Sequence, residues 1–147
     1  MTDPIILLIE DNPDDVALTL RALKKSNILN TVTVACDGAE ALEILLTSAS
    51  VHLMPPGLIL LDLNLPKIDG LEVLRRIRAD ERTRIIPVVV LTSSAQQEDI
   101  LRSYLAGANA YVRKPVDVSE FNEAINSIGK FWMQLNQPAP VSGPSSD

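Results

Sequence analysis

The sequence predicts an α/β fold with a doubly wound, five-stranded parallel sheet. Short apolar runs of strand length alternate with segments whose apolar residues recur at helical spacing, and the chain holds five such strand-helix units. The central runs are apolar at every position, as expected of strands that helices cover on both faces. Polar residues directly follow several runs, at the edge where ligands bind in open sheets of this class.

The N-terminal units are predicted from two apolar runs. Residues 5–9 form the first run, and Asn12 is in position to cap the helix that follows. Asp14 and Asp15 lie in the first turn of that helix, where carboxylates interact favourably with the helix dipole. Residues 31–34 are β-branched and alternate as a strand does, so they form the second strand.

Three further strands are predicted in the rest of the chain. Residues 58–61, 87–91 and 110–112 are apolar runs of strand length. Ser94 and Gln97 have the spacing of a capping box, which predicts that the fourth helix starts at this point. The residues between the runs therefore supply the helices of a βα repeat.

The last predicted helix carries an unusually long apolar stripe, formed by Phe121, Ile125, Ile128, Trp132 and Leu135. We expect its distal part to project beyond the domain and to be buried in a two-fold dimer, with Phe121, Ile125, Trp132 and Leu135 at the contact. The alternative is that the helix end folds back onto its own domain. The predicted domain spans residues 1–136, and the Pro- and Ser-rich residues 137–147 are predicted to be a flexible tail.

Composition narrows the function classes. A chain of 147 residues fits one domain, and its net charge of -6 disfavours a nucleic-acid partner, which needs clustered Lys and Arg. The single cysteine, Cys36, excludes an internal disulfide. The apolar run near the N-terminus is too short for a signal peptide or a membrane span, so we expect no membrane partner and a cytoplasmic protein.

The residues that follow the predicted strands form a chemical constellation. They are Glu10 and Asp11 after the first strand, Asp62 after the third, Thr92 after the fourth and Lys114 after the fifth. Carboxylates gathered at one edge of the sheet repel one another, and a hard divalent cation relieves that repulsion. The sequence therefore predicts a Mg²⁺ pocket.

These residues lie in four segments that together resemble the response-regulator receiver family: LLIEDNPDD, LILLDLNLPKIDG, VVVLTSSA and YVRKP. The resemblance covers residues 5 to about 135. It implies a chemotaxis-regulator-like, flavodoxin-like (βα)5 fold with strand order 2-1-3-4-5. The segment FWMQLNQP and the short chain resemble the small single-domain regulators paired with phytochrome-type histidine kinases.

The resemblance also implies residue roles. Asp62 would accept a phosphoryl group from the phosphohistidine of a partner kinase. Asp11 and Asp62, with the backbone carbonyl of Asn64, would hold Mg²⁺, and Glu10 would act from the outer shell.

The same resemblance gives roles to three residues on the last two strands. Lys114 and Thr92 would each bind a phosphoryl oxygen, and Thr92 would also work with Tyr111 as the conformational switch. The protein would then be a signalling switch rather than an enzyme that turns over a small molecule. It would promote its own phosphotransfer and slow autodephosphorylation, pass its signal to a downstream protein, and form a homodimer.

The same residues disfavour two other functions. Asn64 stands where related aspartyl-phosphate hydrolases place a second acid, which disfavours a phosphohydrolase. A flavodoxin-like cofactor binder needs a phosphate loop after the first strand, but the acidic residues 10–15 would repel a phosphate. The alternative that stays open is a pseudo-receiver, which would act as a dimerising adaptor without phosphorylation.

Overall fold

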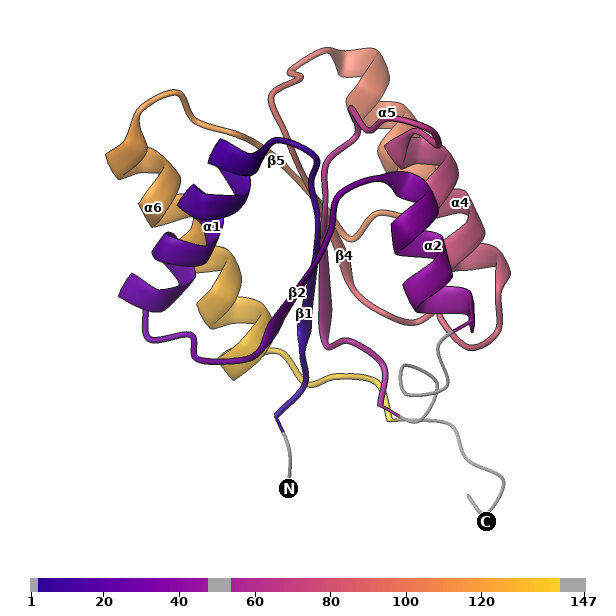
Figure 1. Ribbon diagram of the computed structural model, residues 1–147, viewed down its shortest axis with the longest axis horizontal. Helices are drawn as coiled ribbons and strands as arrows, with labels where there is room; N and C mark the ends of the chain where they lie inside the picture. The colour runs from indigo at the N-terminus through magenta and orange to yellow at the C-terminus, as the bar shows by residue number, and fades with distance from the viewer. Residues whose placement is uncertain (1–2, 48–53, 141–147) are drawn as a thin grey trace.

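The computed structural model describes residues 3–47 and 54–140 and has a single five-stranded parallel sheet in the order β2-β1-β3-β4-β5 (Figure 1). The predicted fold class and strand order are confirmed. The strands are β1 (Ile6–Ile9), β2 (Val32–Ala35), β3 (Leu58–Leu61), β4 (Val88–Thr92) and β5 (Ala110–Arg113). Strands β1, β3 and β4 are buried at every position, which explains why their sequences are apolar up to the terminal Thr92 of β4.

Helices cover both faces of the sheet (Figure 1). They are α1 (Pro13–Lys25), α2 (Gly38–Thr47), α4 (Gly70–Ala79), α5 (Gln97–Leu105) and α6 (Val118–Lys130). Helices α1 and α6 pack over one core, which includes Leu23 and Ile125, and α2 and α4 pack over the other, which includes Leu45 and Leu74. This double cover is the layered arrangement in which a parallel sheet is stable.

The register of the strands brings their carboxyl ends to one level. Ile9 pairs with Leu61, and Leu61 pairs with Val90. The backbone N–H of Asp62 continues the ladder by donating to the carbonyl of Ile9 at 3.0 Å. The polar residues that follow β1 and β3 are therefore held side by side, next to the end of β4.

Gly70 shapes the loop between β3 and α4. Its N–H donates to the carbonyl of Leu63 at 3.0 Å, and a Cβ at this position would collide with the backbone of Asp62 and Leu63. Lys67, in the same loop, has a positive φ of 69°. The absence of a side chain at Gly70 lets α4 begin directly beside Asp62.

The expectation of a projecting last helix is wrong. Helix α6 ends at Lys130, and residues Phe131–Leu135 form a π-helical turn, η1. Trp132 and Met133 pack against the core between the sheet and α1 and α6. The helical end therefore lies against its own domain, which removes part of the large Trp132 and Met133 side chains from water without a partner.

The residues proposed for a dimer contact are corrected accordingly. Phe121 is 4% exposed and Ile125 is 0% exposed, and both belong to the chain's own core. Leu135, by contrast, is 70% exposed. Of the predicted tail, residues 137–140 have no regular structure, and residues 141–147 lie outside the described residues.

The predicted capping box at the start of the fourth helix is also wrong. Helix α5 begins at Gln97 after the cap residue Gln96, which makes no side-chain capping bond. The Ser94 hydroxyl instead donates to the Asp99 carboxylate at 2.6 Å. On α5 only Ser103 is buried, and Leu105 is 78% exposed, so this helix leaves apolar surface uncovered.

Candidate functional site

Three carboxylates meet at the carboxyl edge of the sheet. Glu10 and Asp11 follow β1, Asp62 follows β3, and each offers an oxygen within 4.8 Å of the other two. Glu10 and Asp62 are 3% and 7% exposed, whereas Asp11 is exposed. The cluster therefore has a buried floor and an open side through which a ligand can enter.

Both carboxylate oxygens of Asp62 accept hydrogen bonds. Oδ1 accepts from the hydroxyl of Thr92 at 2.9 Å and from the backbone N–H of Asn64 at 3.1 Å. Oδ2 accepts from the ammonium of Lys114 at 3.0 Å. The fully buried Thr92 side chain and the β3–α4 loop thus orient a carboxylate in a pocket shielded from water.

Lys114 connects three carboxylates. Its Nζ lies 2.5 Å from Glu10 Oε1, 2.8 Å from Asp15 Oδ2 and 3.0 Å from Asp62 Oδ2. Its backbone N–H donates to the carbonyl of Thr92 at 2.7 Å, which fixes the chain at the end of β5. The structure thus brings Glu10, Asp62, Thr92 and Lys114 together, as the sequence predicted from strand ends.

Asp15 is the member of this cluster that sequence reasoning missed. From sequence alone it is a helix-dipole acid in the first turn of α1, beside Asp14. A signal was present, because a helix that starts directly after Glu10 and Asp11 must have its first turn close to that acidic pair.

Burial and charge set the protonation of the cluster. Burial, together with the negative charge of Asp62, raises the pKa of Glu10 to about 7 despite its hydrogen bond with Lys114. Burial alone would lower the pKa of Lys114, but hydrogen bonds to Asp15 and Glu10 raise it above its ordinary value. The ammonium is therefore charged at neutral pH.

The donor set fits a small divalent cation. Glu10, Asp11 and Asp62 supply carboxylate oxygens, the ligands that hard divalent cations prefer. One ammonium faces more carboxylates than it can neutralise, so the pocket retains negative charge. A cation at the open side, beside Asp11, would offset that charge.

Tyr111 is tied to the loop that begins at Thr92. Its hydroxyl donates to the carbonyl of Ser94 at 2.8 Å, and burial raises the pKa of the phenol. The Ser94 side chain in turn bonds Asp99 at the start of α5. The predicted switch residues thus lie at the two ends of the segment 92–94: Thr92 begins it, and Tyr111 is hydrogen-bonded to Ser94 at its end.

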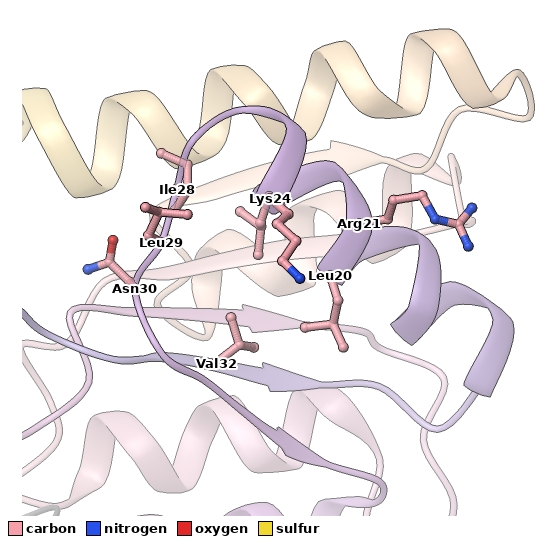
Figure 2. A pocket seen from close by; sticks show the side chains of 8 residues that line it. Leu20, Arg21, Lys24, Ile28, Leu29, Asn30 and Val32 are labelled. Carbon is pink, nitrogen blue, oxygen red and sulfur yellow. The ribbon is translucent and has the colours of Figure 1, made fainter.

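A separate depression of about 510 Å³ lies between the end of α1 and β2 (Figure 2). Leu20, Leu29 and Val32 give it an apolar surface, and Arg21 and Lys24 also line it. None of the predicted site residues lines it. Across residues 3–47 and 54–140, no helix has the length and apolar character needed to cross a membrane.

The chain is similar to known receiver domains in both sequence and structure. Residues 6–126 match the family model for the response regulator receiver domain. Response regulator Rcp1 of Synechocystis is 38% identical over 131 residues, which cover 88% of this chain and 89% of Rcp1. The Mn²⁺-bound structure of Rcp1 matches this fold with a TM-score of 0.84. The match covers 93% of this chain and 99% of the Rcp1 chain.

Two further structures extend the comparison. The phosphorylated cyanobacterial phytochrome response regulator RcpA is 37% identical to this chain and matches its fold with a TM-score of 0.87. The match covers 95% of this chain and 100% of the RcpA chain. The bacteriophytochrome response regulator AtBRR is 49% identical, with a TM-score of 0.71 and coverage of 93% and 100%. The chain therefore belongs to the response regulator receiver domain family and is a phosphoacceptor of two-component signalling, not a pseudo-receiver.

Proposed function

We propose that Asp62 is the residue that accepts the phosphoryl group. The observation that carries this proposal is the arrangement of its carboxylate, which is 7% exposed and has Thr92 on one oxygen and Lys114 on the other. Phosphoryl transfer depends mainly on positioning and on neutralising charge, and these two donors supply both.

In the proposed reaction, a carboxylate oxygen of Asp62 attacks the phosphorus of a phosphohistidine on the kinase. The new O–P bond forms as the P–N bond breaks, and the imidazole leaves with the electron pair and takes up a proton. Lys114 and Thr92 each donate to an oxygen of the transferred group, and the N–H of Asn64 adds a backbone donor. The product is an acyl phosphate, which water then hydrolyses slowly.

The metal in this proposal is Mg²⁺. Asp11, Asp62 and the backbone carbonyl of Asn64 would hold it, with Glu10 bound through water in the outer shell. When bound, the cation supplies charge neutralisation for the phosphoryl oxygens. Both carboxylate oxygens of Glu10 already accept hydrogen bonds, Oε1 from Lys114 and Oε2 from the N–H of Asn12, which supports its outer role.

The proposed phosphodonor is a sensor histidine kinase of the phytochrome type, because RcpA and AtBRR are phytochrome response regulators and are 37% and 49% identical to this chain. The proposed compartment is the cytoplasm, in keeping with a receiver domain whose described residues contain no membrane-spanning helix. The phosphorylated protein would be recognised by a separate downstream protein.

We also propose a homodimer, with contact residues that differ from those expected from the sequence. Phe121 and Ile125 cannot form the contact while the domain is folded. We place the contact instead on exposed apolar groups of the last helical segment, Leu135 and Phe131, which are 70% and 46% exposed, together with Leu105 on α5. Sedimentation velocity of the full chain with Leu135→Ala and Phe131→Ala tests this. The double variant should shift a dimeric protein towards monomer, and a wild type that is monomeric in both phosphorylation states would contradict it.

The phosphorylation proposal is tested with acetyl phosphate and Mg²⁺. Intact-mass analysis of the wild type should show one added phosphoryl group, and Asp62→Asn should show none. Chelation of the metal should suppress the labelling of the wild type. Undiminished labelling of Asp62→Asn would contradict the assignment of the acceptor.

A further inference from the structure

We propose that Asp15 is a positioning residue for phosphotransfer, which fixes the ammonium of Lys114 beside Asp62. This inference rests on the proposed function, because it gives Asp15 a role in the same reaction. Its basis is the 2.8 Å contact between Asp15 Oδ2 and Lys114 Nζ, with the Asp15 side chain 31% exposed and that of Lys114 10% exposed.

The backbone holds Asp15 firmly in the first turn of α1. Its N–H donates to the side chain of the cap residue Asn12 at 3.1 Å. Its carbonyl accepts from the hydroxyl of Thr19 at 2.8 Å, and Thr19 is 2% exposed. The carboxylate therefore projects from a rigid helix end, which gives the ammonium a fixed point outside the strands.

The number of donors on Lys114 shows what Asp15 contributes. An ammonium has three N–H donors, and here three carboxylates from separate parts of the fold accept them, Glu10 after β1, Asp62 after β3 and Asp15 on α1. When Asp62 becomes an acyl phosphate, a phosphoryl oxygen can take over the Asp62 donor. Glu10 and Asp15 keep the other two, so the third continues to point at the transferred group.

Asp14 provides a matched comparison. It lies in the same helical turn and carries the same charge, and its N–H also donates to Asn12, at 2.9 Å. No hydrogen bond joins its carboxylate to Lys114 in the part of the chain that the structure describes. A substitution of Asp14 therefore changes the charge near the pocket without changing the contacts of the ammonium.

The experiment separates charge from contact. Asp15→Asn removes the charge but keeps an oxygen acceptor for Lys114, whereas Asp15→Ala removes both, so the difference between these variants reports the contact. Asp14→Asn and Asp14→Ala form the matched control pair. The initial rate of phosphorylation of the full chain is measured against acetyl phosphate concentration at saturating Mg²⁺, and thermal unfolding of each variant is recorded beside it.

We expect Asp15→Ala to have a maximal rate about five- to tenfold below that of Asp15→Asn, the size of one typical net hydrogen bond, because the Asp15 side chain is partly open to water. The half-saturating donor concentration should differ little between them, because the loss is felt in the transition state. The two Asp14 variants should agree within about twofold, since neither alters a contact of Lys114.

Equal maximal rates for folded Asp15→Ala and Asp15→Asn, in a wild type that is labelled on Asp62, would overturn the role of Asp15 and leave the acceptor assignment intact. A wild type that is not labelled at all would overturn the proposed function and, with it, this role. The two failures are therefore distinguishable.

Discussion

Two half-buried cations lie at opposite ends of the sheet and are held by different kinds of partner. Lys114, at the carboxyl ends of the strands, is bonded to three carboxylates. Arg78, at the end of α4, donates to backbone carbonyls and one amide. Its partners are the carbonyls of Gly107 at 2.8 Å, Arg84 at 2.8 Å and Ile86 at 2.7 Å, and Asn109 Oδ1 at 2.8 Å.

The difference shows that the kind of hydrogen-bond partner distinguishes a cation in a functional site from a cation that only holds loops together. Burial lowers the pKa of Arg78, and among the described residues no carboxylate is paired with it. Backbone carbonyls cannot be exchanged without unfolding, so Arg78 joins the loops before β4 and β5 permanently. At the carboxyl edge of the sheet, a phosphoryl oxygen can replace a carboxylate as the partner of Lys114, and a metal ion can bind the carboxylates instead. The contacts of Lys114 can therefore change while the fold stays intact.

The largest effect should follow removal of the ammonium at the carboxyl end. Lys114→Ala removes the donor for a phosphoryl oxygen, and loss of one such donor typically costs about 100-fold or more in rate. The rate of labelling by acetyl phosphate measures this, with Arg113→Ala, the exposed neighbour, as the control. A rate within about threefold of wild type would mean that Lys114 only balances charge.

At the other end, removal of the cation should affect stability and not phosphorylation. Arg78→Ala leaves carbonyls without their donor, and we expect a loss of about 2–4 kcal/mol in the free energy of unfolding. Urea denaturation measures it, with Arg75→Ala on the exposed side of α4 expected to cost less than about 0.5 kcal/mol. Strongly reduced labelling of folded Arg78→Ala would remove the distinction between the two ends.

Asp11 tests whether the open side of the acidic pocket holds the metal. We expect Asp11→Ala to weaken Mg²⁺ binding about tenfold or more, because it removes a direct carboxylate ligand from a hard cation. Isothermal titration with Mg²⁺ measures the affinity, and Asp14→Ala controls for charge at the start of α1. Wild-type affinity in Asp11→Ala would make Asp11 a neighbour of the helix cap only.

The smallest effect concerns the amide partner of Arg78. Asn109 Oδ1 accepts from both Arg78 and the N–H of Val88 at 2.8 Å. Asn109→Ala should therefore cost about 1–2 kcal/mol of unfolding free energy, less than Arg78→Ala, because the carbonyl bonds of Arg78 survive. Equal losses of unfolding free energy in Asn109→Ala and Arg78→Ala would indicate that the bond to the amide, and not the bonds to the carbonyls, accounts for the stabilisation by Arg78.

The parts that could be predicted from the sequence are those governed by local pattern. The uniform apolar run of β3 ending at Asp62 specifies a buried strand with an acid at its carboxyl end. Parallel strands then bring Glu10, Thr92 and Lys114 to the same edge. Neither step needs knowledge of side-chain packing.

The parts that could not be predicted depend on tertiary contacts. Asp15 and Asp14 are equivalent as helix-dipole acids, and only the path of α1 over the sheet gives Asp15 its contact with Lys114. Ser94 has the spacing of a capping residue, but its Oγ accepts from the N–H of Gln96, ahead of a helix that begins only at Gln97. The periodicity of the last helix likewise cannot show that the helix widens to a π-helix after Lys130 and packs Trp132 onto its own core.

The most direct test of the central claim identifies the phosphorylated residue chemically. The full chain is labelled with acetyl phosphate and Mg²⁺, the acyl phosphate is reduced with borohydride to homoserine, and the position of the homoserine is read by peptide mass spectrometry. The arrangement of Thr92 and Lys114 around one carboxylate predicts homoserine at residue 62 alone. Homoserine at Asp11 or Asp69, with residue 62 unchanged, would contradict the account.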